Sequence, residues 1–205
     1  MFDSGILVKD LIDELKNTEV DIALDIPNAT YVSWLNSLQR LLYTEVIKEQ
    51  RKLNLSVGNS TTVPLTNIVV NSNEEELPRF EDVYTIYTKE GTQLIKTTLA
   101  SGSIFSNCFY KDGTDIGFNA TPDTSQLTVV YIVRPALINV NTYETDNTHV
   151  MLPVEFIELA KSKLRGEAYK LVNEDGIAAK WLNDYNVLLE TFKAWIATKS
   201  ANFGI

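Results

Sequence analysis

The spacing of apolar residues changes twice along this chain, and this change constrains the fold more than any other feature. Near both ends, apolar side chains recur every three or four residues, which is the period of an amphipathic helix. The middle is instead rich in β-branched and aromatic residues separated by turn signals, a pattern typical of hairpins. These periods predict helices over residues 5–17, 28–52, 153–175 and 177–199, and strands within 60–134.

A chain that leaves a set of helices, forms strands and returns to helices brings its two ends together. The sequence therefore predicts an α+β fold, in which the N- and C-terminal helices form a helical bundle and an antiparallel β-sandwich or barrel module is inserted between them. The predicted domains are a discontinuous helical bundle, 1–56 plus 150–205, and an inserted β-module, 57–149.

Turn residues position the predicted strands. Gly91 and the pair Asp112-Gly113 each separate two runs of β-forming residues, which predicts two hairpins. The run Gln126 to Arg134 predicts a further strand, which Pro135 ends. Residues 136–149 lack a helical period and predict a long extended connection, the kind of loop that is often functional.

Composition and charge exclude several classes of protein. Hydrophobic residues make up 44% of the 205 residues, which indicates a folded chain, and no apolar run is long enough to span a membrane. The net charge is −9, and Lys and Arg form no cluster that would bind nucleic acid by sequence. We expect no secretory signal at the N-terminus, and the single cysteine, Cys108, indicates a reducing compartment.

The distribution of charge adds a further expectation. Residues 1–52 carry 6 basic and 9 acidic side chains, residues 53–152 carry 5 and 11, and residues 153–205 carry 7 and 7. The surplus of negative charge therefore lies mainly in the strand-rich middle. An acidic surface is compatible with a protein that DNA slides past without sticking.

No set of residues predicts catalysis, and we expect no enzyme, cofactor or metal. The only histidine, His149, lies in the polar connection and is interpreted as a loop or interface residue rather than a base or ligand. Cys108 lies inside a predicted strand with no basic neighbour, so it is interpreted as a buried structural thiol. The chain lacks ligands for a zinc site, and its scattered glycines form no phosphate-binding loop.

Carboxylates are frequent, and most have a simple structural explanation. The run Glu74-Glu75-Glu76 is typical of a solvated loop. Asp112, Asp115 and Asp123 lie near successive turns, where turn formation explains Asp112 and Asp123, and a calcium site is the less favoured hypothesis. Nothing in the spacing of the acids favours a paired-carboxylate hydrolase.

Aromatic residues offer a second hypothesis for the strands. They are interpreted first as core, because a nucleic-acid platform needs accompanying Lys and Arg; sugar binding stays open. Trp181 and Trp195 are predicted on nearly the same face of one helix, in a core or a subunit interface. The aromatic residues of the middle region are Tyr84, Tyr87, Phe105, Phe109, Tyr110 and Tyr131.

Several stretches carry a family resemblance. They are the helix Leu35 to Lys52 leading into strands, the run Gly113 to Pro122 followed by the strand Leu127 to Pro135, and Leu152 to Ile157 opening a helix that is followed by one containing Lys180 to Tyr185. Their order resembles the head–tail adaptor (connector) proteins of tailed bacteriophages. The long strand insertion looks more like the adaptors of short-tailed phages than the minimal helical adaptors.

The resemblance implies a structural virion protein rather than an enzyme. It implies a homo-oligomeric ring of twelve copies between the portal protein and the downstream tail or nozzle proteins, with the capsid as a further contact. DNA would pass through this ring during ejection without sequence-specific binding, and the ring would be assembled in the host cytoplasm and located at the portal vertex. The C-terminal tail is the predicted portal contact, although it is short, and comprises Ser200, Ala201, Asn202, Phe203, Gly204 and Ile205.

Two alternatives belong to other functional classes. The first is a receptor- or glycan-binding tail accessory protein that uses the aromatic residues of residues 60–134. The second is a hydrolase built on clustered acids, for which the sequence singles out no particular carboxylate.

Overall fold

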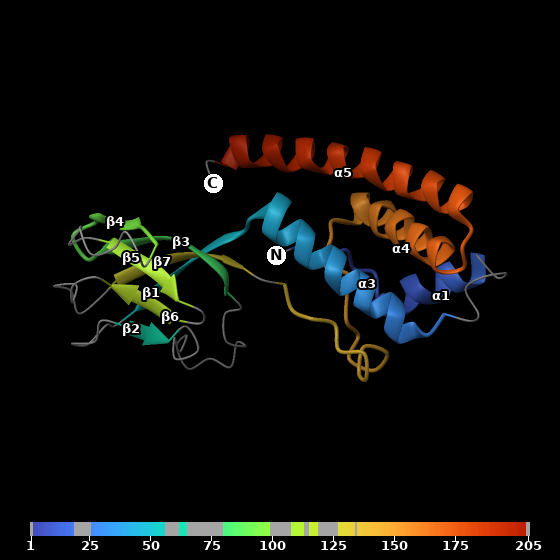
Figure 1. The fold of residues 1–205 in the computed structure, drawn as a ribbon, viewed down its shortest axis with the longest axis horizontal. Helices are drawn as coiled ribbons and strands as arrows, with labels where there is room; N and C mark the ends of the chain where they lie inside the picture. Colours follow the sequence, from blue (N-terminus) through green and yellow to red (C-terminus); the bar gives the residue numbers. More distant parts are fainter. Residues whose placement is uncertain are drawn as a thin grey trace. The chain divides into compact units, whose positions relative to one another are not determined.

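The computed structural model of the chain divides into two compact units (Figure 1). The helical unit combines Met1–Ile47 with Pro135–Ile205, and the strand unit is the continuous segment Lys48–Arg134. The predicted mixture of helices and strands is confirmed. The structure describes residues 2–18, 26–55, 62–64, 80–98, 108–112, 115–118, 127–133 and 135–203.

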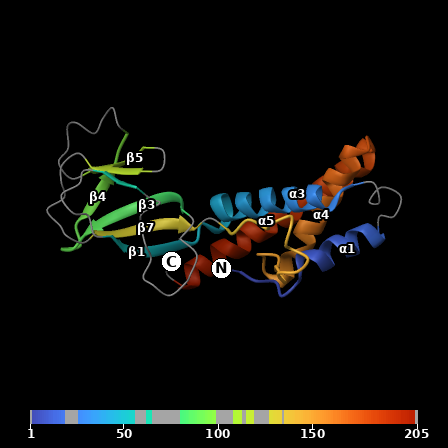
Figure 2. The ribbon, with the colours of Figure 1, turned by 90° about the horizontal axis from the view of Figure 1, so that it is seen from below.

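The helical unit takes its helices from both ends of the chain. Figures 1 and 2 show the blue N-terminal helices beside the orange and red C-terminal helices in both views. The elements are α1 (Val8–Thr18), α3 (Asn28–Leu41), a π-helical turn (Leu42–Ile47), a 3-10 turn (Val154–Phe156), α4 (Ile157–Leu171) and α5 (Asp175–Phe203).

The two N-terminal helices each bury one stripe. Val8, Leu11, Ile12 and Leu15 recur at three- and four-residue spacing in α1 and are all buried. The exposed positions of α1 are charged or polar. In α3 the residues Tyr31, Leu35 and Leu38 are buried at three- and four-residue spacing, whereas Leu41 is 45% exposed.

The C-terminal helices form a hairpin that packs closely at Gly166. A β-carbon built at Gly166 would lie only 2.7 Å from Cγ of Leu182, so only glycine permits the helices to approach this closely. α4 has 15 residues and α5 has 29, which correspond to lengths of about 22 Å and 43 Å at 1.5 Å per residue. α5 therefore continues well past the beginning of α4.

Residues from both ends of the chain share one hydrophobic core. Phe156 and Phe192 are buried with their ring centroids 4.8 Å apart, and the ring of Trp195 lies 5.3 Å from that of Phe156. Phe2 joins this cluster, with its ring 5.7 Å from that of Trp195. Burying an aromatic side chain of this size contributes roughly 1.5–3 kcal/mol, so contacts between the two ends stabilise the unit substantially.

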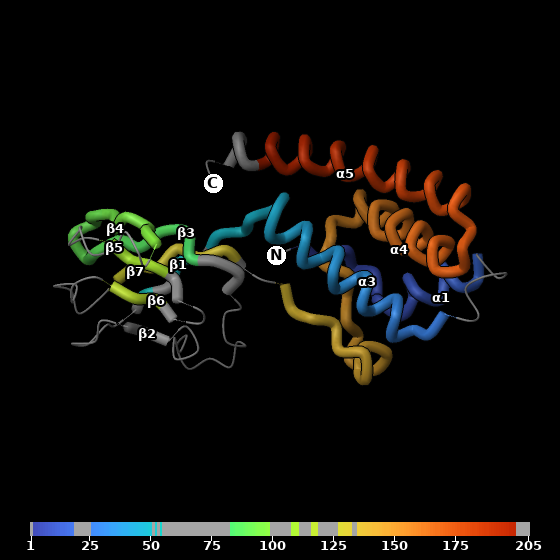
Figure 3. The backbone as a smooth tube through the Cα atoms, viewed as in Figure 1, coloured from blue at the N-terminus to red at the C-terminus, as the bar shows by residue number. Residues whose placement is uncertain are grey.

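The connection between the strand unit and α4 is packed rather than loose. Residues 140–147 form successive turns, within which Tyr143 is buried. Asn36 fixes the start of this segment: its Nδ2 donates to the carbonyl of Ile138 (3.0 Å), and the Ile138 N–H donates to its Oδ1 (2.8 Å). Figure 3 shows the segment as a yellow tube beside α3. As predicted, it contains no helix, but it is coiled and not extended.

The strand unit is one mixed, curled sheet. Its described strands follow the order β1-β7-β3-β4-β5-β6-β2; the β4–β5 pair is parallel and every other neighbouring pair is antiparallel. The strands are β1 (Gln50–Leu55), β2 (Thr62–Pro64), β3 (Phe80–Thr88), β4 (Gln93–Lys96), β5 (Cys108–Asp112), β6 (Asp115–Phe118) and β7 (Leu127–Val133).

A second, smaller core lies inside this sheet. Buried side chains from strands far apart in the sheet order belong to one cluster, which requires the sheet to curl around them. Both predicted hairpins are present, because β3 pairs with β4 and β5 pairs with β6, and Gly91 has the positive φ of 84° that the first turn needs. The cluster comprises Val83, Ile86, Leu94, Phe109, Ile116, Phe118, Leu127 and Val129.

The predicted antiparallel β-sandwich or barrel is confirmed only as a curled sheet. One parallel pair makes the sheet mixed, whereas a wholly antiparallel module was expected. Hydrogen bonds connect all the described strands into a single sheet, so curling of one sheet encloses the core, with no second sheet stacked on it in the described part of the chain.

The first two predicted helices need new boundaries. Residues 5–7 were expected in a helix, but they pair with the connection that precedes α4, and Gly5 has a positive φ of 68°. The second helix was expected to reach residue 52. It ends with the π-helical turn at Ile47, because Lys48 takes a left-handed φ of 47° and Gln50 begins strand β1.

These differences also move the unit boundaries. The units divide at 47/48 and 134/135, whereas 56/57 and 149/150 were expected. The first boundary moves because residues 50–55 pair with β7. The second moves because residues 135–149 pack on α3 and on the N-terminal segment.

Candidate functional site

The N-terminal segment and the connection before α4 form a short antiparallel ladder. The Val150 N–H donates to the carbonyl of Ile6 (2.9 Å), and the Ser4 N–H donates to that of Val150 (3.1 Å). One step further, the Val8 N–H donates to the carbonyl of Thr148 (2.8 Å). The ladder brings together side chains almost 150 positions apart in the sequence.

Two further contacts anchor this ladder to α3 and its π-helical turn. The Phe2 N–H donates to the hydroxyl of Tyr43 (3.0 Å), and the Met151 N–H donates to Oε1 of Gln39 (2.9 Å). Gln39 is buried, and its Oε1 accepts this backbone hydrogen bond, whereas its Nε2 has no hydrogen-bond partner among the described residues. Each of the two segments of the ladder is therefore anchored to the same continuous helical stretch, α3 and its π-helical turn.

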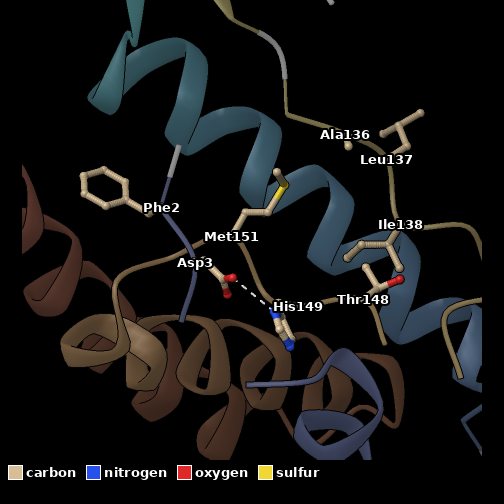
Figure 4. A pocket seen from close by; sticks show the side chains of 8 residues that line it. All are labelled: Phe2, Asp3, Ala136, Leu137, Ile138, Thr148, His149 and Met151. Atoms are coloured by element: carbon tan, nitrogen blue, oxygen red, sulfur yellow. Dashed lines mark hydrogen bonds and ion pairs between the residues drawn. The ribbon is translucent and has the colours of Figure 1, made fainter. Parts of the chain in front are cut away.

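A pocket opens beside the ladder, entirely within the helical unit (Figure 4). Its volume is about 280 Å³, and most of its lining is apolar. A cavity of about 150 Å³ can already hold a benzene-sized group, so this one is large enough for a branched apolar side chain. The pocket is lined by Phe2, Asp3, Ala136, Leu137, Ile138, Thr148, His149 and Met151.

One polar pair, Asp3 and His149, lines this otherwise apolar pocket. Nδ1 of His149 lies 3.1 Å from Oδ2 of Asp3, and the Gly5 N–H donates to the other carboxylate oxygen (2.8 Å). The hydrogen bond from Gly5 lowers the pKa of Asp3 most, and the one from His149 lowers it further. The Asp3 side chain is 62% exposed and that of His149 is 41% exposed. The pocket thus presents a carboxylate that is ionised at neutral pH.

The lining of this pocket combines apolar side chains with one carboxylate, one imidazole and one hydroxyl. Thr148 supplies the one hydroxyl in the lining, and the lining contains no thiol or amine that an imidazole would activate. His149 lies in a connection, where the sequence placed it, and its carboxylate partner is Asp3 from the other end of the chain. Sequence reasoning did not identify Asp3 or Phe2. No residue pattern near His149 in the sequence indicates either of them.

The acids considered for a calcium site, Asp112, Asp115 and Asp123, lie only partly within the described residues. Asp112 and Asp115 are partners in register at the end of the β5–β6 hairpin, and Asp123 and Glu74 to Glu76 lie outside the described residues. Within the described ranges, no three His, Cys, Asp or Glu side chains form a group that would hold a metal ion. Cys108 is buried in β5, as expected of a structural thiol.

The aromatic residues of the strand unit are distributed between its core and its surface. Phe109 and Tyr131 are buried, so they are not available for stacking on a sugar or a base. Tyr87 and Tyr110 are half-buried, Tyr84 is 58% exposed, and Phe105 lies outside the described residues. Of the described members of this set, only Tyr84 is exposed.

The predicted portal-contact tail lies at the end of α5. A tail without regular structure was expected after residue 199, but α5 continues to Phe203. The side chains of Ser200, Ala201, Asn202 and Phe203 lie outside the described residues, as do Gly204 and Ile205 as a whole. Ser200, Ala201 and Asn202 are short or polar, so the sequence at the end of α5 shows no apolar period.

Helices α4 and α5 carry exposed apolar side chains, of which Leu171 and Ile177 belong to the apolar periods that predicted these helices. Leu171 is 56% exposed at the end of α4, and Ile177 is 42% exposed in the first turns of α5. Val187, on α5, is 60% exposed. The two tryptophans of α5 differ: Trp195 joins the core cluster, whereas the Trp181 ring lies under the Arg165 guanidinium at 4.6 Å.

Comparisons with known proteins do not assign a family, because neither a protein-family model nor a curated protein matches the chain. In the described part of the chain, no helix has both the length and the apolar character needed to cross a membrane.

Proposed function

We propose that this chain is a structural virion subunit: a component of an oligomeric adaptor ring between the portal and the tail of a tailed bacteriophage, through which DNA passes. One observation carries the proposal: both ends of the chain build one core, and the residues between them form a separate strand unit. This is the organisation on which the resemblance to short-tailed phage adaptors rests. In this proposal the helical unit builds the ring.

Exposed apolar side chains on the helical unit support a role in assembly. Isolated apolar residues are normal on any surface, but here several large ones are spread over α3, α4, α5 and the connection before α4. A subunit that contacts copies on two sides and a portal above needs several such surfaces. The large exposed side chains of the helical unit are Leu41, Leu137, Val140, Val154, Leu171, Ile177 and Val187.

The balance of charge fits passage of DNA better than binding of DNA. The chain has a net charge of −9, and residues 53–152 carry 11 acidic against 5 basic side chains. A phosphate backbone is repelled by such a surface, which lets DNA move without being held. The partners in this proposal are other copies of the chain, the portal protein and the downstream tail proteins, and the site is the portal vertex of the virion.

Electron microscopy of the purified full-length chain, alone and mixed with purified portal protein, tests the proposal. We expect closed rings with a central opening, either alone or seated on the portal. A chain that remains monomeric at high concentration and does not bind portal contradicts the proposal. The number of subunits, expected to be twelve, is read from the rotational symmetry of the same images.

A further inference from the structure

We propose that the pocket beside the N-terminal ladder is a binding site for a small organic cation, in which an ammonium group is joined to an apolar body. This inference goes beyond the proposed function and does not rest on it. It follows from the composition of the pocket wall, from the charge of one carboxylate and from the hydrogen bonds that hold the wall in place.

The wall of the pocket is apolar on one side and polar on another. Figure 4 shows Ala136, Leu137 and Ile138 together on one segment, and the pair Asp3 and His149 on another side of the pocket. The volume of about 280 Å³ exceeds the cavity of about 150 Å³ that holds benzene, so a ring with a short substituent has room. A molecule with an apolar body and one cationic end matches both sides.

Asp3 supplies a negative charge that no Lys or Arg among the described residues neutralises. Its two carboxylate oxygens accept from the Gly5 N–H (2.8 Å) and lie 3.1 Å from Nδ1 of His149. A carboxylate has about four acceptor positions, so two remain for a ligand. The carboxylate side chain is 62% exposed, and a small cation can reach it from the solvent. While the imidazole is neutral, the pair keeps a full negative charge.

The lining also offers a second acceptor for the same cation. A primary ammonium group has three N–H donors and no acceptor. The hydroxyl of Thr148 lines the pocket together with Asp3, and a hydroxyl oxygen accepts hydrogen bonds. The lining therefore favours an ammonium group, which donates, over a carboxylate, which would be repelled by Asp3.

Basic side chains on the surrounding helices do not line the pocket. The amine of Lys199 lies 4.5 Å from the centre of the Trp195 ring. Lys9 in α1 and Arg40 in α3 are exposed and lie outside the lining. The segments that supply the lining, 2–8 and 135–160, contain five carboxylates and no Lys or Arg. The local charge therefore attracts a cation.

Hydrogen bonds hold the pocket wall in place without a ligand. Asn36 makes two with the backbone of Ile138 (3.0 and 2.8 Å), and Oε1 of Gln39 accepts one from the Met151 N–H (2.9 Å). The backbone ladder between residues 4–8 and 148–150 holds Asp3 beside His149. Because the wall is already ordered, binding a small ligand loses little further conformational entropy.

A nuclear magnetic resonance titration of the full-length chain tests the site, with benzylammonium as the probe. Benzyl alcohol has the same ring without the charge, and benzoate has the opposite charge, so the three probes separate shape from charge. His149 is the only histidine, so its imidazole signals report on the pocket directly. We expect saturable shifts of these signals and of the Gly5 and Val150 amides, with benzylammonium bound about threefold or more tightly than benzyl alcohol and benzoate bound weakest.

Asp3→Asn separates the charge from the shape of the site. Asparagine keeps an oxygen for the Gly5 N–H, so the N-terminal segment is expected to stay in place. The variant should lose the preference for benzylammonium over benzyl alcohol, while its affinity for benzyl alcohol stays within about twofold of the wild type. Asp10→Asn, an exposed carboxylate on α1 outside the lining, is the control and should keep the preference.

Leu137→Ala tests the apolar side of the site. Leu137 is 55% exposed, so this substitution is not expected to unfold the chain. It should weaken benzylammonium and benzyl alcohol alike, by about twofold to fivefold, because both lose the same apolar contact. Leu171→Ala removes an equally exposed leucine at the end of α4 and should change neither affinity.

Three results overturn the proposed site. They are an absence of saturable shifts at His149 up to about 50 mM benzylammonium, equal affinities of the wild type for benzylammonium and benzyl alcohol, and a preference for benzylammonium that survives Asp3→Asn. The test is independent of assembly: a chain that forms rings but does not bind benzylammonium refutes this site alone, and one that binds it but stays monomeric with portal protein refutes the adaptor proposal alone.

Discussion

The two units of this chain differ in how far apart in the sequence their contacting residues lie. In the helical unit, many stabilising contacts join residues more than 100 positions apart, such as Asn36 with Ile138 and Ser4 with Val150. The strand unit is one continuous segment, and its hairpins pair neighbouring strands. The strand unit can therefore form as soon as its own residues are available, whereas the helical unit must wait for both chain ends.

The insertion of the strand unit imposes an entropic cost on folding of the helical unit. Because residues 48–134 lie between the two halves of the helical unit, the helical core forms only after a long loop closes. The aromatic cluster of Phe2, Phe156, Phe192 and Trp195 joins the two ends and offsets that cost. All three tryptophans, Trp34, Trp181 and Trp195, lie in the helical unit, so tryptophan fluorescence reports on this unit alone.

The largest expected effect is on the shared core of the helical unit. Phe192 is fully buried against Phe156 and Trp195, so Phe192→Ala is expected to cost about 3–5 kcal/mol. The measurement is chemical unfolding followed by tryptophan fluorescence, which should shift to much lower denaturant concentration. A separate, unshifted transition in far-ultraviolet circular dichroism is expected from the strand unit; simultaneous loss of both signals would show that the units unfold together.

The corresponding substitution in the core of the strand unit is expected to have a similar or smaller effect. Ile116 is fully buried in the second core, and Ile116→Ala is expected to cost about 2–5 kcal/mol there. The β signal in circular dichroism should be lost earlier while the tryptophan transition keeps its midpoint. A shift of the tryptophan midpoint by the same amount would contradict the independence of the two units.

The close approach of α4 and α5 gives a third, smaller effect. In Gly166→Ala the new methyl group would meet Cδ2 and Cγ of Leu182 at 2.7 Å, and the resulting overpacking is expected to cost about 1–3 kcal/mol. Gly176→Ala is the control, because nothing lies within 4 Å of its added β-carbon, and it should be neutral or slightly stabilising. Thermal unfolding of both variants by circular dichroism distinguishes the two outcomes.

The side-chain hydrogen bonds of Asn36 and Thr128 allow the two units to be compared one residue at a time. Asn36→Ala removes both hydrogen bonds to the backbone of Ile138, which is expected to cost about 1–3 kcal/mol because the site is partly buried. Thr128→Ala removes one exposed bond to Asn54 in the strand unit and should change stability by less than about 0.5 kcal/mol. Equal effects in denaturant titrations would show that long-range anchoring of the connection is unimportant.

The smallest expected effect is the pH dependence of the N-terminal segment. The folded-state pKa of Asp3 is lowered below its usual value of 3.8, first by the bond from Gly5 and then by the bond from His149. A lowered acid stabilises the fold above its unfolded pKa, and this contribution is lost as pH falls through the lowered value. Asp3→Asn should flatten the acid limb of a tryptophan-fluorescence titration; an unchanged limb assigns the acid sensitivity to other carboxylates.

The local sequence pattern was sufficient to predict a helix or a hairpin where the apolar period or the turn residue is unambiguous. The stripe Val8, Leu11, Ile12 and Leu15 predicted α1, and Gly91 predicted the first hairpin. Residues 50–55 were misassigned in part, because Gln50, Arg51 and Lys52 favour a helix as readily as a strand. Pairing of this segment with β7, more than 70 positions later in the chain, made it β1.

The candidate site lay beyond the reach of local pattern for the same reason. His149 was identifiable as a histidine in a polar connection, but nothing near it in the sequence indicates Asp3 or Phe2 as neighbours. A ladder between the first eight residues and the connection brings them together. The exposure of Leu171 and Ile177 was also unpredictable. The apolar period continues to the ends of α4 and α5, but these two side chains lie at the turn between the helices and are not buried there.

The sequence by itself determined that both ends of this chain form helices and its middle forms hairpins, because period and turn chemistry act over a few residues. Only the tertiary structure decided the sheet order, the parallel β4–β5 pair, the point at which the second helix stops and the pocket beside His149. Each of these depends on contacts between distant segments, whose energies are set by which surfaces meet rather than by the order of neighbouring residues.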